Sequence, residues 1–383
     1  MNRLRTKFAM LAATLVLGAA CSTGTSTPSG SPLGSAPANG TPTAGASEPT
    51  APIGLGAIVF NSFGALSTID VDGTNERPIH EGWDGIGLSA DGETFFSPLP
   101  APDGRLAPLI LPTDGSGEVW LPVTDPTLNF GIGDWSPDGT RLVLDAWDDT
   151  DATRKGLYTV ALDGSDLVRL TEAGAGYDWP AYTGTYSPTG DRILFFRTAD
   201  ETDSDGVAMN LFVVSTDGTG LLQLNTPETT TALRGPGGVS SWSPDGTQVV
   251  FVATEGDWAT EPRAVFIAGT DGEPAQRITD WGDILTAQWS PDGERIAMTV
   301  LDGGKHQIFT VRPDGSDVTP ITSTDDGTFC FGAMWSPDSS QLLYLRGRDL
   351  RSDMDLWVSD ADGTNPMQVT HASSEIGGYD WVP

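Results

Sequence analysis

Three segments of the sequence pair an aromatic ring with a carboxylate. An aromatic face can stack on a sugar ring, and a neighbouring carboxylate can accept hydrogen bonds from its hydroxyls or contact a cation or a peptide. These segments therefore predict a surface that binds a glycan or protein partner. The alternative is that the rings only cover the ends of strands while the acids face water. The residues concerned are Trp83, Asp84, Tyr177, Asp178, Trp179, Trp281 and Asp283.

A loop rich in carboxylates offers a second kind of chemistry, the binding of calcium. Glu201, Asp203 and Asp205, together with Gly206, imitate the start of an EF-hand loop. The twelfth position is Phe212 where an EF-hand has Glu, so the match to that motif fails. A looser calcium site built from these three carboxylates stays open, because oxygen-rich loops can bind calcium without the motif.

A third candidate is the one basic cluster, in the segment RGRDLRSDMD at 346–355. Its arginines, Arg346, Arg348 and Arg351, could bind an anionic group. The alternative is that the acids of the same segment neutralise these charges.

The net charge narrows the classes of partner. The chain has 52 acidic and 20 basic residues among 383, which gives a formal charge of −32 at pH 7. Such a surface repels the phosphate backbone of nucleic acids, and it is not drawn to anionic lipid. We therefore expect no nucleic-acid partner and no membrane binding through charge alone. The excess of acid is typical of a soluble surface, or alternatively of one that attracts cations such as calcium.

The N-terminus has the organisation of an export signal. Residues 1–20 begin with basic side chains, continue with an apolar run from Phe8 to Leu17 and end in small residues. The run is short for a membrane span. The ending LGAAC resembles a bacterial lipobox with Cys21 as the lipidated residue, although Leu17 lies four positions before the cysteine where three is commonest. A lipoprotein signal is therefore predicted, and a secretory signal cut nearby is the alternative.

A tether and one folded domain are expected after the signal. Residues 21–56 are mostly Ser, Thr, Pro, Gly and Ala, which is typical of a disordered spacer. Residues 57–383 form the expected domain. Cys330 is the only other cysteine, so no disulfide is available within the mature chain, and its two flanking Phe residues favour a buried thiol. The predicted location is the outer face of the cytoplasmic membrane, the periplasm or the cell envelope.

The candidate sites must be positioned by the unit that repeats along the chain. The turn WSPDG occurs at 135–139, 242–246 and 289–293, with near copies at 88–92, 186–190 and 335–339. Its Pro fixes φ for a type I turn, its Asp tolerates the next position, and its Gly takes the left-handed conformation that leads into a strand. Successive copies are 46 to 56 residues apart, which is the spacing of propeller blades.

A second turn alternates with the first and completes a four-stranded unit. This second turn, which also contains Asp-Gly, has seven copies, from VDGTN at 71 to ADGTN at 361. One unit therefore consists of strand A, the SPDG turn, strand B, a variable loop, strand C, the Asp-Gly turn and strand D. Such an antiparallel unit cannot bury both of its faces alone, so the units must stack radially.

The two ends of the repeat region indicate how the ring closes. The first unit begins with strand B at 57–62 and lacks strand A, while Trp381 lies 46 residues after Trp335, where a seventh strand A would end. The C-terminus is therefore predicted to supply strand A of the first blade, which removes exposed sheet edges. The predicted fold class is all-β, a propeller of seven four-stranded blades, with six blades as the alternative.

The sequence WSPDG, followed by apolar strands, Asp-Gly and Leu-Thr, resembles the TolB-like β-propeller repeat over roughly residues 57–383. The resemblance implies that the Trp of the turn packs between blades and that the Asp caps the turn. It does not imply a function, because this repeat serves many roles. TolB carries a small α/β domain before its propeller, which residues 22–56 do not fit. Propeller peptidases carry an α/β-hydrolase domain, for which neither the length nor a G-x-S-x-G turn is present.

Catalysis is not predicted. Some pectin-degrading lyases with similar repeats bind a metal through histidines near the propeller axis. Here His80 and His371 are expected at the ends of strand D, on the rim, where they cannot converge with His306. No Ser-His-Asp arrangement can be assigned from spacing.

The function predicted from these patterns is that of a lipid-anchored, monomeric, extracytoplasmic propeller that binds a protein or a glycan. The alternative is a hydrolase or lyase acting on extracellular carbohydrate. In this topology the A–B and C–D turns share one face, and the variable B–C and D–A loops share the other. The aromatic and acidic segments belong to D–A loops. The sequence therefore places the partner site on the face of the variable loops.

Overall fold

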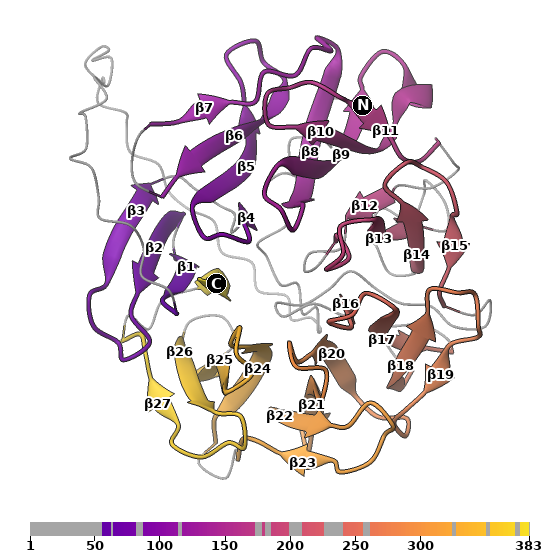
Figure 1. Cartoon of the computed structure of the whole chain (residues 1–383). Coiled ribbons are helices and arrows are strands. Elements are labelled where there is room, and N and C mark those ends of the chain that lie inside the picture. Colours follow the sequence, from indigo (N-terminus) through magenta and orange to yellow (C-terminus); the bar gives the residue numbers. More distant parts are fainter. Residues whose placement is uncertain are drawn as a thin grey trace, which may run out of the picture.

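The chain forms a ring of seven blades around a central axis (Figure 1). The computed structural model describes residues 56–62, 64–81, 87–113, 117–172, 178–180, 185–198, 209–225, 240–255, 261–323, 327–349, 353–371 and 376–382. Within these ranges each blade is an antiparallel sheet of four strands, and strand A is the one nearest the axis. No helix in the same ranges is long and apolar enough to cross a membrane.

The strands follow one order in every blade. Blade 1 comprises β28 (Ile376–Trp381), β1 (Ile58–Ser62), β2 (Ala65–Ile69) and β3 (Arg77–Glu81). Blades 2 and 3 comprise β4 (Gly87–Leu88), β5 (Thr94–Pro100), β6 (Leu106–Pro112) and β7 (Val119–Trp120), then β8 (Leu128–Trp135), β9 (Arg141–Asp148), β10 (Gly156–Ala161) and β11 (Val168–Arg169). A short 3-10 helix, η1 (Ala152–Arg154), lies between β9 and β10.

The remaining four blades repeat this order. Blades 4 and 5 comprise β12 (Asp178–Pro180), β13 (Arg192–Thr198), β14 (Met209–Ser215) and β15 (Leu222–Gln223), then β16 (Ser240–Trp242), β17 (Gln248–Thr254), β18 (Arg263–Gly269) and β19 (Gln276–Arg277). Blades 6 and 7 comprise β20 (Ile284–Trp289), β21 (Ile296–Asp302), β22 (Lys305–Val311) and β23 (Thr319–Pro320), then β24 (Phe329–Trp335), β25 (Gln341–Asp349), β26 (Asp353–Asp360) and β27 (Met367–Gln368). The prediction of seven four-stranded blades is confirmed.

The SPDG turns hold themselves together through local hydrogen bonds. In blade 3, the carboxylate of Asp138 accepts hydrogen bonds from the Ser136 hydroxyl at 2.6 Å and from the Thr140 amide at 3.1 Å. Gly139 then takes a φ of 68°, the left-handed conformation that the sequence predicts. In blade 7 the same position is Ser339, which adopts a φ of 62° without the freedom of glycine. The turn geometry therefore persists even where its preferred residue is absent.

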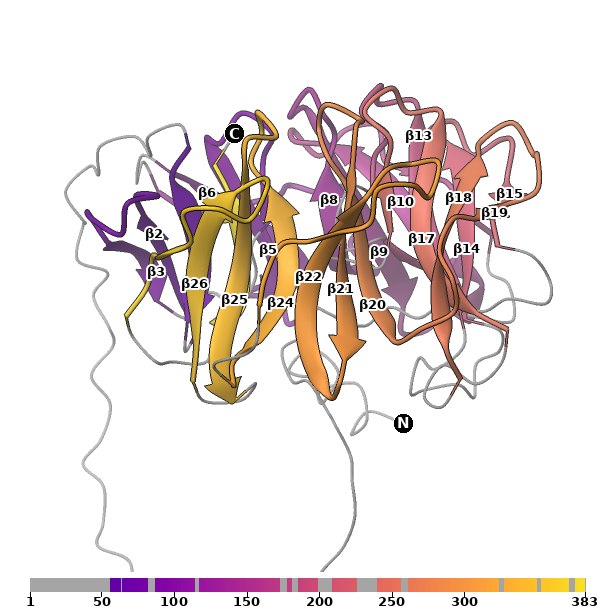
Figure 2. The same ribbon diagram turned by 90° about the horizontal axis from the view of Figure 1, so that it is seen from below.

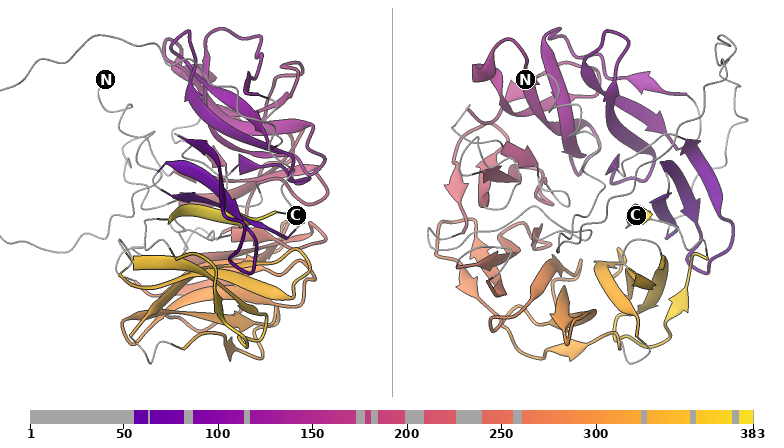
Figure 3. Two further views of the ribbon diagram at one scale, coloured as in Figure 1. Left: turned by 90° about the vertical axis from the view of Figure 1, so that its left-hand side faces the viewer. Right: turned by 180° about the vertical axis from the view of Figure 1, so that it is seen from behind.

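The ring is closed by the C-terminal strand, as predicted. β28 pairs with β1, so that Trp381 faces Ile58 and Tyr379 faces Phe60. Figure 3 shows this strand, in yellow, beside the indigo strands of blade 1. On its other side, the Tyr379 hydroxyl donates to the backbone oxygen of Gly332 in blade 7. One sheet therefore joins the two ends of the described chain.

Three tryptophans at the ends of A strands link neighbouring blades. The indole nitrogen of Trp135 donates to the backbone oxygen of Gly87 at 2.8 Å, and that of Trp335 donates to Gln288 at 3.3 Å. Trp381 reaches Met334 in the same way at 3.3 Å. In each case the acceptor belongs to strand A of the preceding blade. Apolar clusters also extend across blades, so the blades share their cores.

Candidate functional site

Two faces of the propeller differ in the kind of connection that they carry. In Figure 2, β24 runs toward one side and β25 returns toward the other, as in every blade. The A–B and C–D turns therefore share one side, which we call the turn face. The B–C and D–A connections share the opposite side, which we call the loop face. Of the predicted partner residues that the structure describes, Trp281 and Asp283 lie in a D–A connection, on the loop face.

Trp281 and Asp283 lie where the chain passes from blade 5 to blade 6. Trp281 is half-buried, and its ring lies 5.9 Å from the ring of Phe266. The guanidinium of Arg277 lies 5.0 Å from the centre of the indole. Asp283 is exposed, and its carboxylate is 3.4 Å from a guanidinium nitrogen of Arg263. The structure thus places both predicted residues in one connection between blades, where part of the indole is used for packing.

Asp178 has a different environment, in blade 4. Its carboxylate is buried and binds the guanidinium of Arg197 through both oxygens, at 2.5 and 2.8 Å. The same guanidinium lies 5.0 Å from the centre of the Phe212 ring. Both carboxylate oxygens have charged partners, so this side chain positions an arginine within its own blade. It does not lie with Trp281, which follows blade 5.

Several predicted residues fall outside the described ranges or have only a backbone placement. Trp179 lies in β12, and only its backbone is described. The residues outside the described part of the chain are Cys21, Trp83, Asp84, Tyr177, Glu201, Asp203, Asp205 and Arg351.

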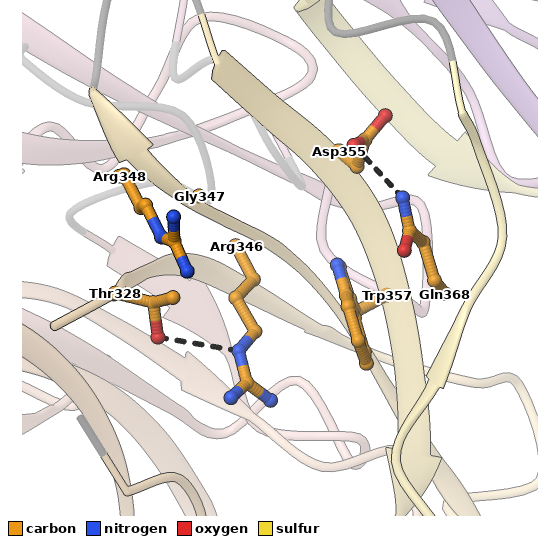
Figure 4. A pocket seen from close by; sticks show the side chains of 7 residues that line it. All are labelled: Thr328, Arg346, Gly347, Arg348, Asp355, Trp357 and Gln368. Atoms are coloured by element: carbon orange, nitrogen blue, oxygen red, sulfur yellow. Dashed lines mark hydrogen bonds between the residues drawn. The ribbon is translucent and has the colours of Figure 1, made fainter. Parts of the chain in front are cut away.

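A pocket of about 280 Å³ opens at the loop-face end of blade 7 (Figure 4). Its lining comes from all four strands or their ends: Thr328, Arg346, Gly347, Arg348, Asp355, Trp357 and Gln368. Two of these, Arg346 and Arg348, belong to the basic cluster that the sequence predicts as an anion site. The structure therefore gives that cluster a concave surface.

A stack of three side chains forms one wall of the pocket. The guanidinium of Arg346 lies 4.7 Å from the centre of the Trp357 indole, and its Nε donates to the Thr328 hydroxyl at 3.3 Å. Gln368 is the register partner of Trp357 on the next strand, and Figure 4 shows it on the other side of the indole. The wall is therefore held by contacts between strands B, C and D.

The carboxylate found among the described lining residues is already bound within the blade. Asp355 is buried, and its two oxygens accept hydrogen bonds from the Gln368 amide at 2.9 Å and the Thr370 hydroxyl at 3.0 Å. Among the described residues, the lining thus contains two guanidiniums and a single engaged carboxylate, within a chain whose net charge is −32. The described lining is therefore positively charged, whereas the chain as a whole is strongly negative.

The sequence indicated only part of this site. Arg346 and Arg348 stand out as a charge cluster, whereas Trp357, Gln368 and Thr328 lie in ordinary strand patterns. Trp357 occupies a strand C position that is aromatic in several blades, as at Tyr158 and Phe266, so its type suggests packing. The signal that could have found it is strand register, since Arg346 and Trp357 fall on one face of the sheet only when β25 and β26 are aligned.

Three aspartates of blades 1 and 3 have raised pKa values. Burial raises the pKa of Asp134 to about 6, although the amides of Thr185 and Trp135 hydrogen-bond to its carboxylate. Burial likewise raises the pKa of Asp145 and of Asp380 to about 7, and the charge of Asp134 adds to the effect at Asp380. At pH 7 the carboxyl groups of Asp145 and Asp380 are therefore partly protonated, whereas that of Asp134 is mostly ionised.

The three histidines occupy three different blades. His80 on β3 contacts Glu118 at 2.5 Å, and His371 follows β27. His306 on β22 packs against the ring of Phe331, and burial lowers its pKa. Among the residues that the structure describes, no three His, Cys, Asp or Glu side chains are grouped to hold a metal ion. Cys330 is a buried thiol, as predicted.

Comparisons with known sequences identify the family that the repeat resembles. Residues 220–371 match the family model of the TolB beta propeller domain. The chain is 31% identical over 122 residues to Dipeptidyl-peptidase 5 of Porphyromonas endodontalis, a match that covers 31% of this chain and 17% of that protein. It is 30% identical over 127 residues to the Protein TolB homolog of Chlorobaculum tepidum, covering 33% and 27%. The matches thus span less than a third of these curated relatives.

Solved structures show the same fold at low identity. An oligogalacturonate lyase in complex with manganese matches with a TM-score of 0.56 and 16% identity, over 77% of this chain and 82% of that chain. The β-propeller domain of the Trilobed protease from Pyrococcus furiosus matches with a TM-score of 0.56 and 13% identity, over 83% and 96%. At these identities the likeness concerns the fold alone.

Proposed function

Because this chain is a TolB-like β-propeller, we propose that it is an exported, lipid-anchored binding protein that presents its loop face to a protein or glycan in the cell envelope. The propeller acts as a rigid scaffold in this proposal. The partner is recognised by side chains that differ from blade to blade.

One observation carries the proposal, namely the contrast between the two faces. The turn face repeats a single set of local hydrogen bonds, as at Asp138, Asp245 and Asp338. The loop face carries different chemistry in different blades, including an exposed acid beside a half-buried indole and a positively charged pocket. Variable positions on a repeating scaffold are where binding specificity resides.

The anchor rests on the N-terminal sequence. Lipid on Cys21, followed by the spacer to residue 56, would hold the propeller away from a membrane surface. In the native host, Cys21→Ser should therefore move the protein from the membrane fraction into the soluble fraction. Equal membrane partition of the variant and the parent would remove lipid anchoring from the proposal.

Partner binding is tested with the protein in its native envelope. The full chain with an affinity tag is cross-linked in cells and purified, alongside a variant with Trp281→Ala and Asp283→Asn. We expect a defined protein or glycan to be captured by the parent and lost with the variant. The control is Arg312→Gln, which removes a partly exposed arginine on the turn face. A partner captured equally by all three would move the site away from Trp281.

The alternative is a hydrolase or lyase that acts on extracellular carbohydrate. The observation in its favour is the set of interior carboxyl groups, because a pKa of about 6 or 7 suits a general acid. Incubating the purified full chain with neutral and acidic oligosaccharides, and analysing the products by mass spectrometry, tests this directly. Turnover that is lost in Asp380→Asn would replace binding with catalysis as the function.

A further inference from the structure

We propose that the pocket of blade 7 binds a sugar acid, through its carboxylate and its hydroxyl groups. The inference deepens the proposed function, on which it rests in placing a ligand on the loop face. It adds the chemical class of the ligand, and it locates the binding site within a single blade.

Donors dominate the polar groups that face the pocket. Arg348 is exposed and makes no ion pair or hydrogen bond with any residue that the structure describes. The indole N–H of Trp357 likewise has no acceptor within the described ranges. Arg346 adds a second guanidinium, held against the indole at 4.7 Å. Guanidinium and indole groups donate hydrogen bonds and cannot accept them, so the matching ligand group is an acceptor that carries negative charge.

A carboxylate fits these donors better than a larger or more highly charged anion. The pocket holds about 280 Å³, which lies at the lower end of the volumes of ligand sites. The surrounding surface is strongly acidic, with a net charge of −32 over the chain, and it repels a polyanion. A single carboxylate can bind both guanidiniums, and the acidic surface repels it less than it repels a polyanion.

The rest of the lining favours a sugar over a peptide terminus. The Thr328 hydroxyl also accepts from Arg346, and the amide nitrogen of Gln368 is bound to Asp355 and to the backbone oxygen of Thr370. The side-chain oxygens of these two residues can accept hydrogen bonds from hydroxyl groups of a ligand. Among the lining residues that the structure describes, none has an aliphatic side chain, and the one apolar group is the Trp357 indole. A peptide terminus would bring an apolar or bulky side chain with no matching surface. A pyranose with one carboxylate supplies the acceptors and hydroxyls that this lining can bind.

The experiment is a calorimetric titration of the purified full chain with four probes. D-glucuronate and D-galacturonate carry the carboxylate, D-glucose lacks it, and acetyl-Gly-Gly carries a carboxylate without the sugar ring. We expect saturable binding of at least one sugar acid with a Kd of about 1 mM or lower, and no binding of glucose. Raising the salt concentration should weaken binding, because Arg348 is exposed to solvent.

Variants locate the binding site. Arg348→Gln should raise the Kd at least tenfold, and Arg348→Lys should restore part of the affinity by keeping the charge. Trp357→Phe keeps the aromatic ring and removes only the N–H, and should raise the Kd about fivefold. The matched control, Arg312→Gln, removes one arginine from the turn face and should leave the Kd unchanged. Thermal melting of each variant confirms that the blade is intact.

Each outcome decides the proposal. Binding of a sugar acid that is lost in Arg348→Gln and kept in Arg312→Gln supports it. Equal affinity in those two variants overturns the site, and binding of acetyl-Gly-Gly without either sugar acid overturns the sugar class. No binding of any probe up to about 10 mM overturns both. If a cell-envelope partner is nevertheless captured through Trp281, the proposed function stands while this inference fails.

Discussion

The turn face and the loop face are built from the same seven blades, yet their side chains bond in different ways. On the turn face, aspartates such as Asp138 and Asp338 bond to groups two residues away in the chain. On the loop face, Asp178 binds an arginine 19 residues away, and the Arg346–Trp357 stack joins two strands. Local bonding makes the turn face uniform, whereas contacts between strands give each loop-face site its own character.

The largest effect is expected from removing β28, because this strand closes the ring that supports both faces. Deleting residues 377–383 removes most of β28, and with it the buried side chains of Tyr379 and Trp381. It also exposes the edge of β1. The free energy of unfolding should fall by about 5 kcal/mol or more, measured by denaturant titration. A truncated protein as stable as the parent would show that closure by β28 supports neither face.

A change of pH should alter the stability of the fold through two classes of aspartate, which act in opposite directions. The first class comprises the aspartates whose pKa is raised by burial. The folded protein holds protons on Asp145 and Asp380 up to about pH 7, while the unfolded chain releases them near its ordinary value of about 3.9. The folded state therefore binds more protons between these values, and stability should rise as pH falls from 8 to 5. Each group contributes roughly 1 kcal/mol per pH unit. Melting curves across this range measure the effect.

The turn aspartates act in the opposite direction at lower pH. Hydrogen bonds from the Ser336 and Ser340 hydroxyls lower the pKa of Asp338 to about 2. Its contribution to stability is present above the ordinary pKa and is lost as pH falls toward 2. Stability should therefore be greatest at about pH 4 to 5. Asp380→Asn should flatten the rise between pH 8 and 5, and an unchanged slope would show that this carboxyl group does not titrate there.

On the loop face, Trp281→Ala should weaken partner binding by about 2 kcal/mol, the scale of an aromatic hot spot. Because the ring is half-buried against Phe266, the melting temperature should also fall slightly. Binding and melting are measured on the same preparation. Lost stability with full binding would assign Trp281 to packing and would remove it from the partner site.

The smallest effect is expected from a single turn. Asp338→Ala removes the acceptor for the Ser336 hydroxyl and for the amide of Ser340, and should cost about 1 kcal/mol of stability. Binding to the loop face should not change, because the substitution lies at the opposite end of blade 7. A loss of binding without a loss of stability would contradict the division of roles between the faces.

The loop-face site could be predicted from the sequence only in part. The pairing of Trp281 with an acid, and the charges of Arg346 and Arg348, are visible as neighbours in the chain. Trp357 and Gln368 lie 11 and 22 residues beyond Arg346, within strands whose pattern indicates only packing. Asp178 shows the converse, since a residue that reads as a ligand contact is bound within its own blade by Arg197.

The sequence by itself determined the turns, the number of blades and the strand that closes the ring. The turns depend on backbone geometry at Pro and Gly and on hydrogen bonds between close neighbours, so a short segment is sufficient to specify them. The number of blades and the closing strand follow from counting the repeats and from the missing strand A of the first unit. Only the tertiary structure decided which side chains form the pocket of blade 7 and which aspartates hold a proton. Both depend on the register between strands and on burial by adjacent blades, which arise when distant segments pack.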